Sequence, residues 1–152
     1  MITSRLQLYA SPAPPRQRLK NLATDAKSAI VGKVLILIVE DHTDTRVVLT
    51  SLLGRSGYRI ISANRVREAT ELLEKMHFDI LLSDIGLPDG DGLEVVRKAK
   101  ALQPHIRAIA LTARGTEKDY DLGRDAGFDY YLTKPFDLHE LRLVLENCKA
   151  AA

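Results

Sequence analysis

The stretch Phe78–Gly92 has the sequence FDILLSDIGLPDGDG, in which an apolar run is followed by a loop of small residues. The apolar run leads to a single acid, Asp84, a pattern typical of a buried strand. Glycine, proline and aspartate then follow, and these residues favour turns. The sequence therefore predicts a buried strand that ends at the carboxylate of Asp84. Little bulk surrounds that carboxylate, and Gly90 and Gly92 allow sharp turns before the next helix.

Other parts of the chain repeat this alternation of apolar runs and helical spacing. Strands are predicted over 34–39, 58–63, 78–83, 106–112 and 128–133. Helical spacing is found around 49–53 and over 66–76, 93–102, 115–126 and 138–148. The pattern over 115–126 is the weakest, because it has few apolar positions and an internal Gly123, which costs about 1 kcal/mol relative to alanine.

This alternation predicts an α/β fold built from βαβ units. We expect a doubly wound, five-stranded parallel sheet with helices on both faces and right-handed crossovers. The 152 residues are enough for one domain with a substantial core. In such a sheet all the carboxyl ends of the strands lie on one edge, and ligands bind there.

Composition excludes several classes of protein. No apolar run approaches the length of a membrane span, and the N-terminus lacks the apolar core of a secretory signal. Cys148 is the only cysteine, so neither a disulfide framework nor a cysteine metal site is expected. The sequence therefore predicts a cytoplasmic protein without a membrane segment.

The N-terminal part differs in charge from the rest. Residues 1–33 contain six basic residues and one acidic one, whereas the whole chain has a net charge of +2. We interpret 1–32 as a basic, proline-containing tail or linker, with a short helix over 18–30, and 33–150 as the folded domain. Such a tail can contact nucleic acid or an acidic partner, but a solvated linker is the simpler interpretation.

Polar residues stand at four of the predicted strand ends. Glu40 and Asp41 follow the first strand, Asp84 ends the third, Thr112 ends the fourth and Lys134 follows the fifth. Three neighbouring carboxylates repel one another and call for a cation, and hard oxygen ligands favour Mg²⁺ or Mn²⁺. A lysine and a hydroxyl opposite the cation indicate a phosphoryl group. Asp84 would be the nucleophile that forms an acyl phosphate.

Four motifs in order resemble the receiver domain of two-component response regulators, in a style similar to receivers of hybrid histidine kinases. They are IVEDHTDTR (38–46), LLSDIGLPDGDGLEVV (81–96), IALTA (109–113) and AGFDYYLTKPF (126–136). The resemblance extends from Val34 to about Lys149. It implies a flavodoxin-like sheet with strand order 2-1-3-4-5, and a phosphoprotein that catalyses only its own phosphorylation and dephosphorylation.

The resemblance also assigns the metal and phosphoacceptor positions. Glu40 and Asp41 would be the acidic pair around Mg²⁺, and Asp84 the phosphoacceptor and a further metal ligand. The backbone carbonyl of Gly86 would be another metal contact. Many receivers carry a larger side chain at the position of Gly86, so we expect an open site here, partly covered by Arg114.

The remaining positions of the resemblance concern the switch. Lys134 would contact a phosphoryl oxygen, and the Lys134–Pro135 peptide is typically cis. Thr112 would move toward the phosphoryl group, and Tyr131 would change rotamer with it. The surface of the fourth helix, fifth strand and fifth helix would then respond. The implied partners are a histidine kinase or histidine phosphotransfer protein and a downstream protein, with no direct DNA binding, in a monomer or weak dimer.

Three other functions compete with this hypothesis. A phosphatase of the haloacid-dehalogenase type would need a second aspartate where Gly86 stands. A nucleotide or flavin site would need a glycine-rich loop after the first strand, and the chain has the acidic EDHTDT (40–45) there. A phosphorylation-independent interaction module has the same fold, and only the complete set of site residues argues against it.

Overall fold

The computed structural model describes residues 34–113 and 115–150. The predicted tail 1–32, its helix over 18–30, and Arg114 lie outside the described residues. Among the described helices, none combines the length and the apolar character needed to cross a bilayer.

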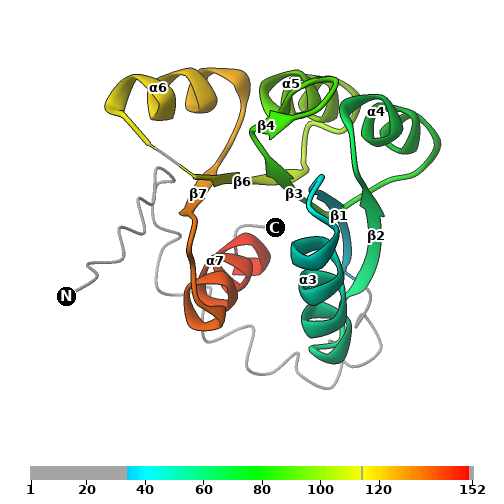
Figure 1. Cartoon of the computed structure of the whole chain (residues 1–152). Helices are drawn as coiled ribbons and strands as arrows, with labels where there is room; N and C mark the ends of the chain where they lie inside the picture. Colours follow the sequence, from blue (N-terminus) through cyan, green and yellow to red (C-terminus); the bar gives the residue numbers. More distant parts are fainter. Residues whose placement is uncertain (1–33, 114, 151–152) are drawn as a thin grey trace.

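A five-stranded parallel sheet forms the centre of the molecule (Figure 1). Its strands are β1 (Leu35–Val39), β2 (Arg59–Ala63), β3 (Ile80–Asp84), β6 (Arg107–Thr112) and β7 (Tyr130–Thr133). Their order is β2-β1-β3-β6-β7, which confirms the predicted 2-1-3-4-5 topology. All five strands begin one or two residues later than predicted, because the first residues of each apolar run belong to the preceding loop.

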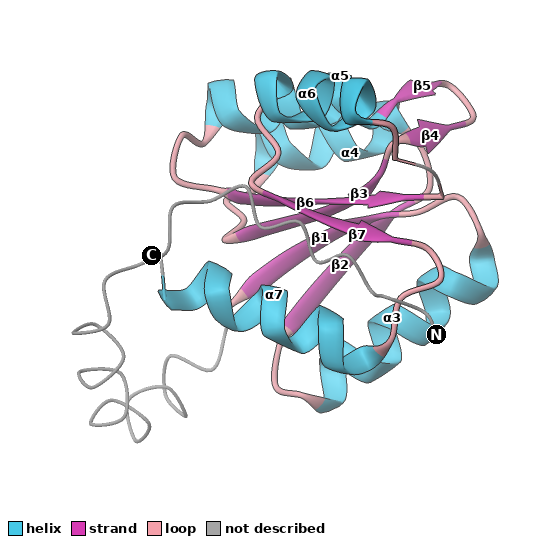
Figure 2. Cartoon of the chain, turned by 90° about the vertical axis from the view of Figure 1, so that its left-hand side faces the viewer, coloured by secondary structure: helices cyan, strands magenta, loops and turns pink. Residues whose placement is uncertain are grey.

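Helices cover both faces of the sheet (Figure 2). They are α3 (Thr43–Arg55), α4 (Val66–Lys75), α5 (Gly92–Leu102), α6 (Glu117–Ala126) and α7 (Leu138–Ala150). α4, α5 and α6 lie on one face, and α3 and α7 lie on the other (Figure 2). The doubly wound architecture predicted from the sequence is confirmed.

Alternation along each strand divides the core into two clusters. In β1, Leu35, Leu37 and Val39 pack beneath α4 and α5, whereas Ile36 and Ile38 pack against α3 and α7. All five residues are buried. This two-sided burial explains why the strand is apolar at every position.

The weak helical pattern over 115–126 does form a helix, α6. Its N-terminus carries a capping box in which the Thr116 side chain accepts a hydrogen bond from the Asp119 N–H and the Asp119 carboxylate accepts one from the Thr116 N–H. Two backbone donors are thereby satisfied, which helps to offset the low helix propensity of the segment. The helix ends at Ala126, and its C-cap is Gly127, whose φ of 127° favours glycine.

A buried glutamine after α5 is bonded to the end of α4 and to the segment that leads into β3. The Gln103 amide oxygen accepts from the Phe78 N–H (2.7 Å), and its nitrogen donates to the carbonyls of Leu73 (3.0 Å) and Met76 (2.7 Å). Gln103 follows directly after α5 and is buried. It satisfies backbone groups where α4 ends and the chain turns toward β3.

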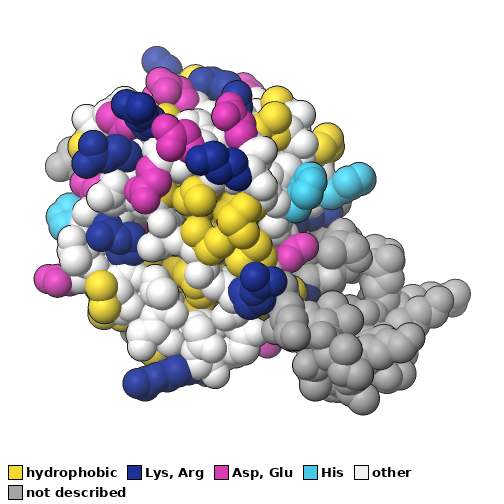
Figure 3. All heavy atoms as spheres, turned by 90° about the vertical axis from the view of Figure 1, so that its right-hand side faces the viewer, with side chains coloured by type: hydrophobic (Ala, Val, Ile, Leu, Met, Phe, Trp, Pro, Cys, Tyr) yellow, Lys and Arg dark blue, Asp and Glu magenta, His cyan; other side chains and the backbone are white. Residues whose placement is uncertain are grey.

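The side of the molecule near the edge strand β2 is shown in Figure 3. Hydrophobic side chains form a central patch on this side, and charged side chains of both signs gather above it (Figure 3). Within β2, Arg59 is exposed and Ile60 and Ile61 are half-buried. A charged residue at a sheet edge discourages pairing with another strand.

Candidate phosphoryl-transfer site at the carboxyl edge of the sheet

Lys134 joins two acidic strand ends. Its Nζ lies 2.7 Å from Glu40 Oε2, after β1, and 2.9 Å from Asp84 Oδ2, at the end of β3. Lys134 itself follows β7, so three separate strands supply the three groups. The structure thus brings together the sequence-predicted lysine, the first acid of the predicted pair and the predicted phosphoacceptor.

Burial makes this cluster electrostatically strong. The Glu40 side chain is fully buried, and the side chains of Asp84 and Lys134 are 14% and 24% exposed. Burial disfavours the charged form of Lys134, but its hydrogen bonds to Glu40 and Asp84 outweigh that effect and raise the pKa of Lys134. The ammonium is therefore charged at neutral pH.

Asp41 lies beside Glu40 and is partly exposed. The ligand atoms of Glu40, Asp41 and His42 all lie within 4.8 Å of one another. Arg46, in the first turns of α3, donates from Nη1 to the Glu40 carbonyl (2.7 Å) and holds the backbone of the acidic pair. The sequence interpretation missed this role of Arg46. Arg46 lies on the first turn of α3, close in sequence to Glu40 and Asp41, and this position was the available signal for a contact with them.

The loop after Asp84 is a tight hairpin. β4 (Gly86–Leu87) and β5 (Gly90–Asp91) pair antiparallel, with Gly86 opposite Asp91. The Gly86 N–H donates to Asp84 Oδ1 (3.1 Å), which fixes the carboxylate relative to the loop. A Cβ on Gly86 would meet nothing within 4 Å, so the expectation of open space at this position is met.

Gly92 has a different role from the predicted one. Among the described residues, only Gly57 and Gly127 have positive φ, so neither Gly90 nor Gly92 is needed for a left-handed turn. A Cβ on Gly92 would overlap the backbone carbonyl oxygen of Asp84. Close backbone approach, rather than turn conformation, therefore explains this glycine.

The aspartates of the hairpin cap neighbouring helices. Asp89 Oδ1 accepts from the Val66 N–H (2.7 Å) and its Oδ2 accepts from the Arg67 N–H (3.0 Å) at the start of α4. The hydrogen bond from Arg67 lowers the pKa of Asp89 most. Asp91 is the N-cap of α5. The hairpin that follows Asp84 is thus tied to two helices.

Thr112 and Tyr131, the predicted switch residues, are both buried and lie on the neighbouring strands β6 and β7. Thr112 ends β6, is buried, and accepts through its carbonyl from the Lys134 N–H (2.7 Å). Tyr131 is 1% exposed and its hydroxyl donates to the Tyr120 carbonyl (3.0 Å) in α6. The Tyr131 side chain is therefore turned into the core beneath α6. The Lys134–Pro135 peptide is cis.

The donor set fits a hard divalent cation. Glu40, Asp41 and Asp84 supply carboxylate oxygens at one edge of the sheet, and Asp41 is the most exposed of the three. A fully buried carboxylate that shares one lysine with a second carboxylate leaves the cluster net negative. Carboxylates with room for water are the environment that Mg²⁺ prefers.

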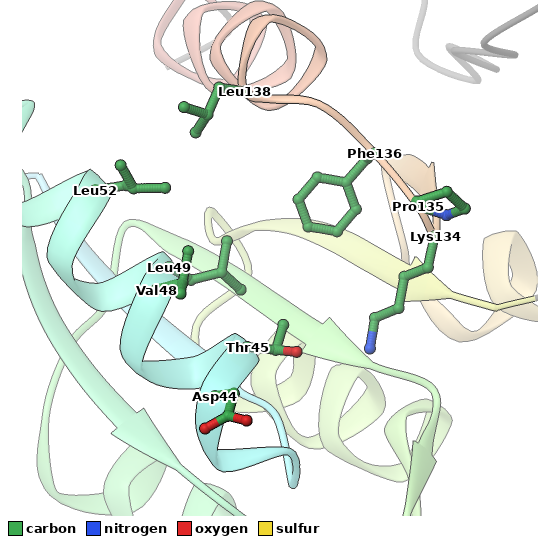
Figure 4. A pocket seen from close by; sticks show the side chains of 9 residues that line it. All are labelled: Asp44, Thr45, Val48, Leu49, Leu52, Lys134, Pro135, Phe136 and Leu138. Atoms are coloured by element: carbon green, nitrogen blue, oxygen red, sulfur yellow. The ribbon is translucent and has the colours of Figure 1, made fainter. Parts of the chain in front are cut away.

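A pocket of about 450 Å³ adjoins the cluster and shares Lys134 with it. It lies between α3 and the segment that leads into α7, and Figure 4 shows Phe136 and Leu138 facing the helix across it. Its remaining lining residues are Asp44, Thr45, Val48, Leu49, Leu52 and Pro135. Val48 and the neighbouring Val47 are exposed. An apolar hollow therefore lies next to the charged site.

Comparison with known proteins defines the class. The family described as response regulator receiver domain matches residues 36–146, and these include all four strand ends described above. The chain belongs to the response regulator receiver domain family. It is thus a signalling phosphoacceptor of the two-component class rather than a conventional enzyme, and receiver domains typically bind a divalent cation.

Three relatives illustrate the match. An uncharacterized 14.6 kDa protein of Leptolyngbya boryana is 40% identical over 118 residues, which are 76% of this chain and 90% of the relative. The response regulator protein PilR of Pseudomonas aeruginosa is 41% identical over 106 residues, 70% of this chain but only 24% of PilR. A response regulator of Burkholderia pseudomallei, solved with a phosphorylated aspartic acid, a calcium ion and citrate, has 26% identity and a TM-score of 0.70, with 76% of this chain and 68% of that chain covered.

Proposed function

We propose that the chain accepts a phosphoryl group on Asp84 in a Mg²⁺-dependent reaction and thereby switches a protein surface. The observation that carries the proposal is the bridge from Lys134 to both Glu40 and Asp84. Three strands converge on one ammonium, and the residue types are those that phosphoryl transfer needs.

In the proposed reaction, an Asp84 carboxylate oxygen attacks the phosphorus of a phosphohistidine or of acetyl phosphate. The new O–P bond forms as the bond to the leaving imidazole or acetate breaks, and the leaving group retains the electron pair. Lys134, now beside Asp84 Oδ2, would stabilise the negative charge on the phosphoryl oxygens. The Gly86 N–H holds the other Asp84 oxygen, which orients the nucleophile.

We propose that Glu40, Asp41, Asp84 and the carbonyl of Gly86 hold the cation, Mg²⁺ or Mn²⁺. When bound, the cation neutralises phosphoryl charge during transfer. Glu40 is buried and Arg46 holds its backbone, so the chain is fixed at this position. Its carboxylate is also bonded to Lys134, so cation binding would require Glu40 to share its oxygens between Lys134 and the cation.

We propose a phosphohistidine-bearing protein, either a histidine kinase or a phosphotransfer protein, as the physiological donor. The apolar pocket next to Lys134 supports a protein donor, because a small phosphodonor would not use it. Thr112 and Tyr131 would carry the change to the surface of α6, β7 and α7, where a downstream protein would bind. The domain would extend over 33–150, with 1–32 as its linker, and would act in the cytoplasm as a monomer or weak dimer.

Phosphoryl incorporation from acetyl phosphate tests the proposal. Intact mass should show one added phosphoryl group on the wild-type chain with Mg²⁺ and none with a chelator. Asp84→Asn should abolish the addition. Asp125→Asn, which removes an exposed aspartate of α6, should keep it.

The opposite results separate the alternatives. Incorporation that survives Asp84→Asn would place the phosphoryl group elsewhere. No incorporation under any condition would instead favour the phosphorylation-independent interaction module.

A further inference from the structure

The α6-facing side of β6 and β7 carries a column of hydroxyl side chains. Ala110 and Tyr131 belong to the core cluster beneath α6 and are cross-strand partners. Two residues further along, Thr112 and Thr133 are partners in the same register. Because side chains alternate along a strand, both threonines lie on the α6 side. Thr133 directly precedes Lys134.

Tyr120 of α6 contacts this column at two points. Its hydroxyl lies 3.2 Å from Thr133 Oγ1, and its backbone carbonyl accepts the hydrogen bond from the Tyr131 hydroxyl. The two tyrosine rings also pack edge to face, with centroids 4.8 Å apart and an interplanar angle of 85°. One residue of α6 therefore contacts both the buried tyrosine and the strand end next to Lys134.

Gly123 provides the space for Tyr131. It lies inside α6, where glycine is a poor choice for helix stability. A Cβ at this position would overlap the Tyr131 hydroxyl oxygen and crowd the ring. The buried orientation of Tyr131 thus needs a residue without a side chain at 123.

We propose that Tyr120 and Gly123 form a seat in α6, the Tyr131 seat, that holds Tyr131 buried and couples it to the phosphoryl site. These are positioning residues, and the inference rests on the proposed function. With Tyr131 seated, the Tyr120 hydroxyl stays on Thr133 and supports the strand end that carries Lys134 and faces Thr112. Loss of the seat would release that strand end and weaken phosphoryl binding at Asp84.

Gly123→Ala is the decisive variant, and Gly54→Ala is its matched control. Both replace a glycine within a helix by alanine, but a Cβ on Gly54 meets nothing within 4 Å. Alanine favours helix, so neither change is expected to prevent folding. Tyr120→Phe provides a second test, because it removes the hydroxyl on Thr133 and leaves the ring and the carbonyl in place.

The first readout is the environment of Tyr131. Fluorotyrosine incorporated at the five tyrosines gives separate ¹⁹F resonances, and Tyr131→Phe assigns the relevant one. Gly123→Ala should move this resonance toward its solvent-exposed position, and Gly54→Ala should leave it unchanged. An unchanged Tyr131 resonance in Gly123→Ala would refute the seat.

The second readout is the affinity for beryllofluoride with Mg²⁺, a mimic of the phosphoryl group. Gly123→Ala and Tyr120→Phe should each lower this affinity. We expect Gly123→Ala to lower it about 5-fold or more, because coupling between two sites changes binding affinity by such factors. A displaced Tyr131 with unaltered affinity would overturn the coupling. If the wild type itself fails to bind beryllofluoride, the proposed function and the coupling fall together, whereas the ¹⁹F resonance still decides whether the seat exists.

Discussion

Lys134→Met should destabilise the folded domain far more than removal of a lysine from a surface ion pair of similar length. Among the described residues, Lys134 is the basic side chain that contacts both the fully buried Glu40 and the largely buried Asp84. Removal of one partner of a buried ion pair costs about 3–5 kcal/mol, because an uncompensated charge stays in the interior. Lys134 is 24% exposed, and water can partly replace it, so we expect the lower end, about 3 kcal/mol.

Lys98→Met is the matched control. Its Nζ lies 2.8 Å from Glu74 Oε1, close to the distances at Lys134, but the two side chains are 41% and 53% exposed. Exposed ion pairs contribute about 0–1 kcal/mol. The two variants therefore remove the same side chain from ion pairs of similar length, and they differ in burial and in the number of carboxylates that lose a partner, two at Lys134 and one at Lys98.

Urea unfolding followed by far-ultraviolet circular dichroism measures the free energy of unfolding of both variants. A chelator is present so that no metal ion neutralises the charge of the carboxylates. The chain has no tryptophan, so backbone ellipticity is the practical signal. The pKa of Lys134 is raised, so its contribution is complete below the unfolded value of 10.5 and is lost as the pH rises through the folded value. A Lys134→Met loss no greater than that of Lys98→Met at neutral pH would refute the electrostatic account of the site.

Four further predictions concern single residues. Gln103→Leu should lower the free energy of unfolding by about 2–4 kcal/mol in urea titrations, because it leaves buried backbone groups without hydrogen-bond partners. A loss no larger than that of a surface substitution would contradict the role described for Gln103. Asp89→Asn should lower the melting temperature at neutral pH, and its difference from wild type should shrink as the pH falls below 3.8 through the lowered pKa of Asp89; a gap independent of pH would argue against the cap. Burial raises the pKa of Cys148 to about 12, so iodoacetamide should alkylate it at least about a hundredfold more slowly in the folded than in the urea-unfolded chain, and equal rates would show an accessible thiol. Gly86→Asn should fold normally and change the dephosphorylation rate of the labelled chain, and an unaltered rate would remove Gly86 from control of water access.

The sheet could be predicted from sequence because the patterns that specify its strands and helices lie in short, continuous segments. Five apolar runs separated by helical spacing define an alternating α/β chain, and the edge rule for parallel sheets then brings Glu40, Asp84 and Lys134 together. In the structure Lys134 contacts both Glu40 and Asp84. Their chemical roles stay predictions until phosphorylation is measured.

The rest depends on contacts that no periodic pattern encodes. The hairpin after Asp84 is too short to produce an alternating pattern, and Gly92 is explained by one close approach to a backbone carbonyl. Arg46 acts through the backbone of the acidic pair rather than through its charge alone. Gly123 weakens the helical pattern when α6 is considered by itself, and its reason appears only when Tyr131 is packed against it.

The anchoring of the hairpin after Asp84 has a consequence for the length of the chain there. Exposed turns are usually where insertions and deletions are tolerated. This one is fixed at both ends and at its tip: the Gly86 N–H bonds Asp84, the Gly92 N–H bonds the Ile85 carbonyl (2.7 Å), and Asp89 caps α4. One added residue would pull at least one of these contacts apart. The turn that directly follows Asp84 is therefore expected to be among the segments of the domain least able to change in length.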